Sequence, residues 1–269
     1  MKIYSNGDII DKEKSAEVFE PGFLFGWGVF EPLRVYGDNI AFLDSHISRL
    51  ESSLEIIGIE SPKIEWEKEI RNLISINNIE NAYIRITAYK KRKGTGALIY
   101  ADKFAYYTDE VYNKGFTSLI SSYERNTLDA GSQIKSLSYL QNRLSWFQAQ
   151  KENKDEAIVL NQYGSIVGGS RSNLFIVNEG RIMTPSSDEG SFEGITREVV
   201  FDIAAKAGIE FLESKLTMEE LATAEEAFIT SALMEVMPLV ECEDKPLGNG
   251  KPGELTLKIL SEYRKIVNS

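Results

Sequence analysis

The sequence predicts an α+β fold divided into two domains. Segments with alternating hydrophobicity and segments with helical spacing follow one another without the regular strand–helix–strand order of a parallel sheet. Residues 121–131 have turn composition and no hydrophobic periodicity, which is typical of a connection. We therefore expect an N-terminal α+β domain over residues 1–120, an interdomain linker over 121–131 and a C-terminal domain over 132–269.

The N-terminal domain is predicted to contain two hairpins, two helices and a further pair of strands. Asn6-Gly7 is a hairpin turn signal, and a second hairpin turns at Gly37. Asp44 is the expected N-cap of a helix that stops before Gly58. The remaining elements expected here are a helix over 64–76 and strands over 82–90 and 96–108, which flank the basic loop KKRKGTG.

The C-terminal domain is predicted to mix short strands with helices. A helix is expected from about Lys135 to Lys151, and four short strands are expected between residues 155 and 185. Thr217 and Glu220 have the spacing of a capping box. The other expected elements are a helix that starts after GITRE and stops before Gly208, strands over 226–231 and 235–241, and a terminal helix after Pro252.

Charge and residue counts exclude several classes of function. The net charge of -11 repels phosphate backbones and anionic lipids, so we expect neither nucleic acid nor membrane as a partner. One cysteine, Cys242, and one histidine, His46, exclude internal disulfides, Ser-His-Asp triads and clustered zinc ligands, so no metal site is expected. We find no signal peptide and no long apolar run, and we expect a cytoplasmic protein.

Two short stretches have features of a binding site. Lys135 lies among apolar residues in IKSLSYL, where a solvated charge is unusual, although a lysine at a helix start would explain it. The helix start GITRE leaves backbone N–H groups near Ile195 and Thr196 pointing outward, which suits an anion, although a simple capped helix has the same sequence. His46 is interpreted as a structural histidine, and Arg49 as a surface charge or a cleft residue.

A series of segments, in order along nearly the whole chain, resembles the fold type IV family of pyridoxal-phosphate enzymes. This family contains branched-chain and D-amino-acid aminotransferases and aminodeoxychorismate lyase. The resemblance implies a two-domain architecture like that of D-amino-acid aminotransferase, pyridoxal 5'-phosphate as cofactor, and a homodimer. The matching segments are FGWGVFEPLRVY, HISRL, IKSLSYL, DEAIVLNQYGSIV, SNLFIV, MTP, GITRE, AEEAFITSALMEVMP and GNGKPGELT.

The resemblance implies a role for each matching position. Lys135 would carry the cofactor as a Schiff base and move a proton at the substrate α-carbon, chemistry that a neutral amine in an apolar setting can perform. The cofactor would contact Arg49, Tyr139, Ile195, Thr196, Ser231 and Ala232, the last of which stands where many relatives offer a threonine. The substrate would contact Phe30, Tyr83, Arg85 and Leu233.

One position departs from the family pattern. Gly168 stands where relatives have a glutamate that bonds the pyridine nitrogen of the cofactor. Loss of such a charged hydrogen bond, about 1.5 to 3 kcal/mol, would slow the reaction roughly 10- to 100-fold. We hypothesise that Arg171 contacts the ring nitrogen instead. If the missing carboxylate limits the rate, Gly168→Glu should raise any transaminase activity.

The expected reaction is amino-group transfer between an amino acid and a 2-oxo acid, because transamination is the commonest activity of the family. The stretch AYIRI resembles branched-chain enzymes, whereas KSLSYL has the shorter spacing of D-amino-acid aminotransferase and aminodeoxychorismate lyase. One alternative is therefore pyruvate elimination from 4-amino-4-deoxychorismate, giving 4-aminobenzoate. A second alternative is a catalytically impaired relative, suggested by Gly168 together with Ala232.

Overall fold

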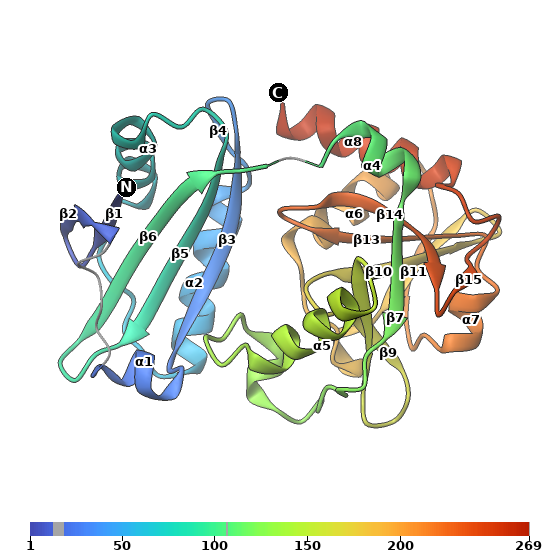
Figure 1. Cartoon of the computed structure of the whole chain (residues 1–269), viewed down its shortest axis with the longest axis horizontal. Helices are drawn as coiled ribbons and strands as arrows, with labels where there is room; N and C mark the ends of the chain where they lie inside the picture. Colours follow the sequence, from blue (N-terminus) through green and yellow to red (C-terminus); the bar gives the residue numbers. More distant parts are fainter. Residues whose placement is uncertain (13–18, 106, 269) are drawn as a thin grey trace. The chain divides into compact units, whose positions relative to one another are not determined.

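The computed structural model describes residues 1–12, 19–105 and 107–268, and it divides into two compact units (Figure 1). The first unit comprises residues 1–105 and 134–139 together with Asn268, and the second comprises residues 106–133 and 140–267. Each unit has its own sheet with helices packed against it. The predicted mixture of helices and strands without regular alternation is therefore confirmed.

The first unit is built on an antiparallel sheet with the strand order β2-β1-β6-β5-β3-β4. Both predicted hairpins are present: Ser5 pairs with Asp8 around Asn6-Gly7, and Tyr36 pairs with Asn39 at the second turn. The strands are β1 (Lys2–Ser5), β2 (Asp8–Asp11), β3 (Gly28–Tyr36), β4 (Asn39–Ile40), β5 (Ala82–Lys90) and β6 (Thr95–Lys103).

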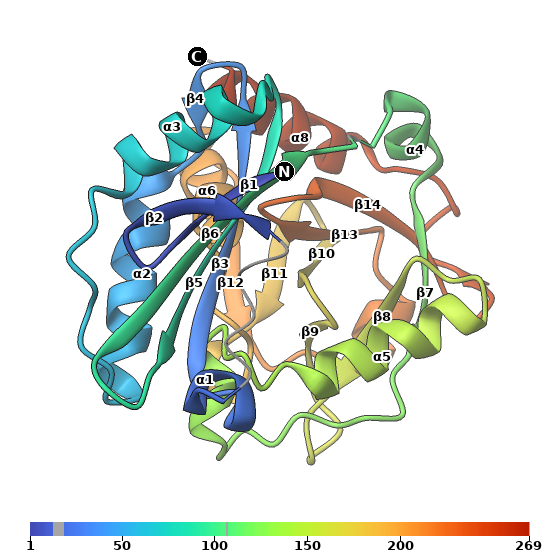
Figure 2. The same cartoon turned by 60° about the vertical axis from the view of Figure 1, so that its left-hand side comes forward.

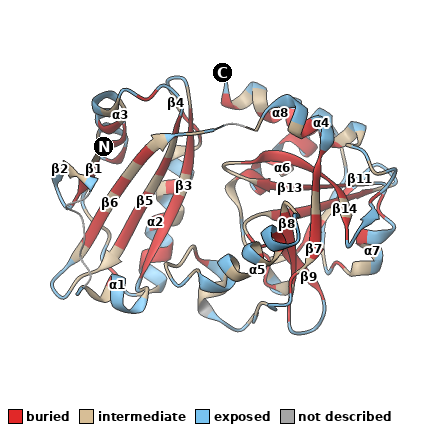
Figure 3. Cartoon of the chain, viewed as in Figure 1, coloured by how far each residue is buried: buried red, intermediate tan, exposed pale blue. Residues whose placement is uncertain are grey.

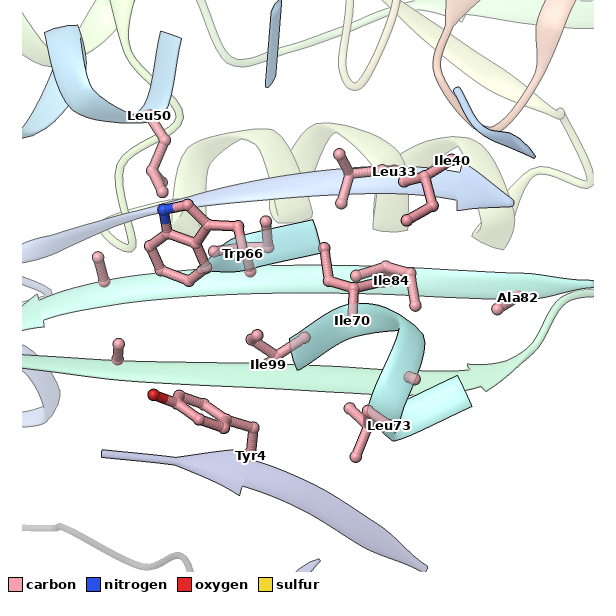
Figure 4. Close-up of a cluster of buried hydrophobic side chains, with 14 of the residues drawn as sticks. Tyr4, Leu33, Ile40, Leu50, Trp66, Ile70, Leu73, Ala82, Ile84 and Ile99 are labelled. Carbon is pink, nitrogen blue, oxygen red and sulfur yellow. The ribbon is translucent and has the colours of Figure 1, made fainter. Parts of the chain in front are cut away.

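Helices α2 (Leu43–Ile56) and α3 (Trp66–Asn77) cover one side of this sheet (Figure 2). Their apolar faces include Leu50, Trp66 and Leu73, which lie over Ile84 of β5 in a core with almost no solvent exposure (Figure 4). Side chains alternate between the two faces of a strand, so the neighbours of these core residues project from the opposite face of the sheet. A short helix, α1 (Pro21–Phe25), precedes β3.

The start of α2 differs from the prediction. Phe42, in a left-handed conformation with φ 54°, is the N-cap residue, and Asp44 lies inside the first turn. An acidic side chain is favourable there because the helix dipole is positive at that end. The sequence therefore associates Asp44 correctly with the helix start, but the prediction that it is the cap is wrong.

The second unit is built on a mixed sheet with the order β12-β11-β10-β13-β14-β7-β8-β9, and β15 pairs with β14. Buried residues run along its central strands (Figure 3). The strands are β7 (Phe116–Ile120), β8 (Glu156–Leu160), β9 (Ile166–Gly169), β10 (Asn173–Asn178), β11 (Arg181–Pro185), β12 (Phe211–Ser214), β13 (Glu226–Ser231), β14 (Glu235–Cys242) and β15 (Lys245–Pro246).

Helices of the second unit pack on this sheet from several points of the sequence. Helix α8 packs against β13 and β14, α6 packs against β13 and α8, and α5 packs against β8. The predicted capping box of Thr217 and Glu220 is present at the start of α7. The helices are α4 (Asp109–Lys114), α5 (Leu140–Lys151), α6 (Ile195–Lys206), α7 (Met218–Ala222) and α8 (Glu254–Val267). No helix within the described residues is long and apolar enough to cross a membrane.

The unit boundaries differ from the predicted domain boundaries. Strand β7 was expected in the N-terminal domain, but it pairs with β14 and β8 of the second sheet. Residues 121–131 are not a free linker, because Arg125 pairs with Asn161 and its N–H donates to the Leu160 carbonyl. Conversely, residues 134–139 belong to the first unit. These pairings join residues far apart in the sequence, which local composition does not reveal.

Candidate active site

The lysine singled out in the sequence lies in a turn, one residue before an isolated β-bridge at Ser136, and the predicted helix begins only at Leu140. The N–H of Phe30 donates to the carbonyl of Lys135 (2.9 Å), and the N–H of Leu137 donates to the carbonyl of Gly28 (2.9 Å). Val29 and Ser136 form an antiparallel bridge between these bonds. Residues 135–137 thus pair with the start of β3 through one isolated bridge, and this long-range pairing overrides the predicted helix start.

Four predicted substrate and cofactor residues gather on the face of the first sheet opposite α2. The edge of the Tyr139 ring meets the Phe30 ring at a centroid distance of 5.2 Å. The guanidinium carbon of Arg85 lies 3.7 Å from the centroid of Phe30, a cation–π contact. Tyr83, two residues before Arg85 in β5, projects from the same face of the sheet. The first unit therefore presents a tyrosine and an arginine beside an aromatic platform and the half-buried Lys135.

On the other face of β3, the buried carboxylate of Glu31 binds Arg49, the residue predicted to contact the cofactor phosphate. Glu31, which is 1% exposed, accepts hydrogen bonds from Nε (2.8 Å) and Nη2 (2.6 Å) of Arg49. Nδ1 of His46 lies 2.7 Å from Oε2 of the same carboxylate. Burial alone would raise the pKa of Glu31, but the bonds from His46 and Arg49 outweigh it and lower that pKa to about 2.

His46 has the structural role that the sequence predicted. Burial lowers the pKa of His46 against the opposing effect of Glu31, and the charges of Arg49 and Lys135 lower it further. A neutral imidazole that bonds Glu31 is the consequence. His46 and Glu31 together fix the guanidinium of Arg49, which sequence reasoning assigned to the cofactor phosphate without identifying its partners.

The second unit carries the predicted anion site at the start of α6. Gly194 is the N-cap residue, and no side chain caps the helix. Thr196 is 2% exposed, and its hydroxyl has no hydrogen-bond partner among the described residues. A Cβ at Gly194 would overlap the side-chain oxygen of Asn173, so only glycine fits this approach. Free helix-terminal N–H groups at Ile195 and Thr196 next to an unsatisfied buried hydroxyl fit a phosphate group.

The predicted loop at Ser231, Ala232 and Leu233 connects β13 to β14. Ser231 pairs with Glu235 across the hairpin, and the N–H of Met234 donates to the Ser231 carbonyl (3.2 Å) and hydroxyl oxygen (3.1 Å). Ala232 and Leu233, at the tip, are half-buried. One residue before the loop, the buried hydroxyl of Thr230 has no partner among the described residues, a position that sequence reasoning missed.

The strand around Gly168 is shaped for glycine. Gly168 has φ 138°, and a Cβ there would lie 2.8 Å from the Ser172 carbonyl oxygen. Arg171 contacts the Asp155 carbonyl (Nη2 to O, 3.4 Å), and its guanidinium carbon lies 5.2 Å from the Trp146 ring centroid. Its role at a cofactor ring nitrogen stays a prediction, and these contacts place the guanidinium beside α5.

The predicted residues thus form two groups, one on each unit. Lys135, Tyr139, Phe30, Tyr83, Arg85 and Arg49 lie on the first unit, and Gly168, Arg171, Ile195, Thr196, Ser231, Ala232 and Leu233 lie on the second. Glu31 and Glu235 lie inside matching segments, but neither was predicted as a site residue, because a glutamate in a strand is ordinarily a surface residue. No cluster of metal-ligating side chains occurs in the described part of the chain.

Comparison with known proteins gives a consistent result. The family model for amino-transferase class IV matches residues 28–242. A putative branched-chain-amino-acid aminotransferase of Methanocaldococcus jannaschii is 34% identical over 99% of this chain and 96% of its own length. Aminodeoxychorismate lyase of Bacillus subtilis is 31% identical over 99% of this chain and 95% of its own length.

Solved structures agree with the sequence comparison. Branched-chain aminotransferase from Thermoproteus uzoniensis with norvaline superposes with a TM-score of 0.91, at 34% identity, over 100% of this chain and 95% of that one. A T.th. branched-chain amino acid aminotransferase with pyridoxamine 5'-phosphate gives a TM-score of 0.93 at 28% identity over 99% of this chain and 94% of that one. The predicted fold type IV architecture is confirmed.

Proposed function

Because this chain belongs to the class IV aminotransferase family, we propose that it transfers an amino group between an amino acid and a 2-oxo acid through Lys135. The observation that carries the proposal is the pairing of the lysine segment with β3. This pairing fixes the backbone of Lys135 beside Phe30 and Tyr139, whose rings meet edge to face. A catalytic amine needs such a fixed position, because small displacements cost large factors in rate.

Class IV aminotransferases use pyridoxal 5'-phosphate, and the residues present fit this cofactor. The start of α6 offers unpaired N–H groups and the unsatisfied hydroxyl of Thr196 to a phosphate. Arg49 would add a guanidinium oriented by Glu31. Once bound, the cofactor supplies an electron sink for the bond to the substrate α-carbon.

The side chains of this chain would perform the remaining tasks. Lys135 would hold the cofactor covalently and then, as a free amine, move the proton of the substrate α-carbon. Arg85 and Tyr83 would bind a substrate carboxylate, since a guanidinium and a phenol both donate to carboxylate oxygens. The ring of Phe30 would exclude water and contact the apolar part of the substrate.

The experiment is cofactor capture at Lys135 combined with an amino-transfer assay. We expect a yellow protein in which borohydride reduction attaches the cofactor to Lys135, located by peptide mass spectrometry. A panel of amino acids that includes branched-chain donors, with 2-oxoglutarate, should turn over in the wild type. Lys135→Ala should lose at least about 10³-fold in rate, because it removes both the covalent link and the base.

Attachment at another lysine, or equal rates for Lys135→Ala and the wild type, would contradict the proposal. The matched control is Lys151→Ala, since Lys151 is exposed and lies at the end of α5. This variant should keep the wild-type rate.

A second candidate function is favoured by the likeness to the Bacillus subtilis aminodeoxychorismate lyase, which spans 99% of this chain. In that case the protein would release pyruvate from 4-amino-4-deoxychorismate and give 4-aminobenzoate. Pyruvate formation without any turnover of the amino-acid panel would select the lyase. A colourless protein that ignores added pyridoxal phosphate would instead indicate the catalytically impaired relative.

We also propose that the protein acts as a homodimer. Three phenylalanines around α1 are largely exposed: Phe19 (73%), Phe23 (68%) and Phe25 (72%). Trp27, next to them, is also exposed. Exposed aromatic side chains so close in the sequence are unfavourable in water and support an interface here. Light scattering should give twice the monomer mass, and Phe23→Asp with Phe25→Asp should shift the protein to monomers, whereas a monomeric wild type would contradict the proposal.

A further inference from the structure

The hairpin loop after β13 ends in an unusual backbone conformation. Glu235, the first residue of β14, has φ 55°, in the left-handed region that glycine or asparagine usually occupies. It pairs with Ser231, so its conformation sets the path of the residues between them. A loop of this form commonly ends in a left-handed residue, and glycine is its ordinary occupant. A glutamate at this position needs a compensating interaction.

The compensating interaction comes from the C-terminal helix. Glu235 is 2% exposed, and its Oε2 accepts a hydrogen bond from Nε of Arg264 in α8 (2.8 Å). Nη1 of the same guanidinium donates to Asp109 at the start of α4 (2.8 Å). A buried carboxylate with a guanidinium partner holds a single geometry, because breaking the pair would leave an uncompensated charge.

A tyrosine attaches the same cluster directly to the loop. The guanidinium carbon of Arg264 lies 4.3 Å from the ring centroid of Tyr112, and the hydroxyl of Tyr112 donates to the carbonyl of Met234 (3.4 Å). Arg264 is therefore linked to two successive loop residues, to Glu235 directly and to Met234 through Tyr112. Burial opposes the charge on Arg264, but the bonds to Glu235 and Asp109 outweigh it and raise its pKa above the ordinary value.

We propose that Glu235 and Arg264 are positioning residues that fix the loop of Ser231, Ala232 and Leu233 in the shape that binds the cofactor phosphate. The inference rests on the proposed function, which assigns this loop to the phosphate. Ala232 cannot donate from its side chain, so the loop can bind an anion only through correctly directed backbone N–H groups and Ser231. Such a site depends on backbone geometry, which the ion pair with Arg264 secures.

The test compares pyridoxal 5'-phosphate with pyridoxal, which lacks the phosphate, as ligands of the protein stripped of its cofactor. Glu235→Gln and Arg264→Gln should each weaken binding of pyridoxal phosphate about tenfold, the size expected for a lost charged hydrogen bond. Binding of pyridoxal should change less than about twofold, since it does not use the loop. The double variant should lose little more than either single variant, because both remove one interaction.

Two further variants separate positioning from general damage. Glu235→Gly accepts the left-handed conformation and should fold, yet it lacks the ion pair and should show the same phosphate-dependent loss. Lys265→Gln alters the next residue of α8, whose side chain is 68% exposed and pairs with Glu262, and should bind both ligands like the wild type.

Unchanged binding of pyridoxal phosphate in the Glu235 and Arg264 variants would overturn the inference and leave the proposed function intact. Equal losses for both ligands would also overturn it, since they would indicate a general structural role. A wild-type protein that binds neither ligand would reject the proposed function itself, and this result is obtained before any variant is made.

Discussion

Glu31 in the first unit and Glu156 in the second are both buried, and their carboxylates are stabilised by different partners. Glu31 of β3 bonds the guanidinium of Arg49 and the imidazole of His46. Glu156 of β8, which is 0% exposed, accepts hydrogen bonds from the hydroxyls of Ser170 and Ser172 and from the N–H of Ala157. Nε of Arg171 lies 3.9 Å from Oε2 of Glu156.

The difference separates two ways of building a site. The carboxylate of Glu31 orients the cationic side chain of Arg49, so the stability that it contributes depends on its charge. The carboxylate of Glu156 accepts hydrogen bonds from neutral donors in the turn that follows β9, so it stabilises the backbone conformation of that turn. Gly168 and Gly169 are the last residues of β9 before that turn, and a Cβ at Gly169 would meet the Glu156 carboxyl carbon at 3.0 Å. We expect substitutions to break these two arrangements to different extents.

The largest effect should come from Glu31→Ala. The substitution removes the carboxylate from the buried His46 and the partly buried Arg49 and opens a cavity, and we expect a loss of about 4 kcal/mol in the free energy of unfolding. Urea denaturation at neutral pH measures it. The matched control is Glu67→Ala, an exposed glutamate paired with Arg71, which should cost at most about 0.5 kcal/mol. A similar loss in both variants would contradict the role of burial.

The pH dependence of stability sharpens the same comparison. The folded-state pKa of Glu31, about 2, lies below its ordinary value of 4.5, so this carboxylate contributes stability above pH 4.5 that is lost as the pH falls toward 2. At about 1.4 kcal/mol per pH unit the difference corresponds to about 3 kcal/mol. Denaturation between pH 5 and pH 2 should show this loss in the wild type, and a parallel decline in Glu31→Gln would refute the assignment to Glu31.

At the second glutamate we expect a smaller effect. Glu156→Gln keeps the shape of the side chain but turns an amide NH2 group toward donors, so the free energy of unfolding should fall by about 2 kcal/mol. Ser172→Ala removes one of these donors and should lower the free energy of unfolding by less than Glu156→Gln does. In the double variant the two losses should add only partly. Full additivity in urea denaturation would show that the two side chains do not interact.

The smallest effect is expected at Gly168. Gly168→Ala places a Cβ on a residue with φ 138° and 2.8 Å from a carbonyl oxygen, and it should cost about 1.5 kcal/mol. Gly168→Glu meets the same strain, so we expect it to lower stability and not to raise the rate of amino transfer. A faster Gly168→Glu enzyme would show that the strand adapts and that the missing carboxylate limits the rate.

Local sequence signals predict the elements whose partners are close in the chain. Asn6-Gly7 indicates a hairpin, and Thr217 with Glu220 indicates a capped helix, because turn and cap residues act within a few positions. The helix predicted from about Lys135 to Lys151 is present, but its start is wrong, because residues 135–137 pair instead with β3, about a hundred residues away. The family motifs identify the candidate site residues, but not Glu31, which contacts Arg49 only after a strand and a helix have packed together.

The pairing of residues 135–137 with β3 constrains the order in which the first unit can fold during synthesis. During synthesis, residues 1–105 emerge before the lysine segment, and β7 of the second sheet also precedes it. The hydrogen bonds between β3 and residues 135–137 can therefore form only after β7 of the second unit has been synthesised. A fragment cut after residue 105 would lack Lys135, the proposed catalytic amine, whereas a fragment cut after residue 139 would contain it but would also contain β7 of the second sheet.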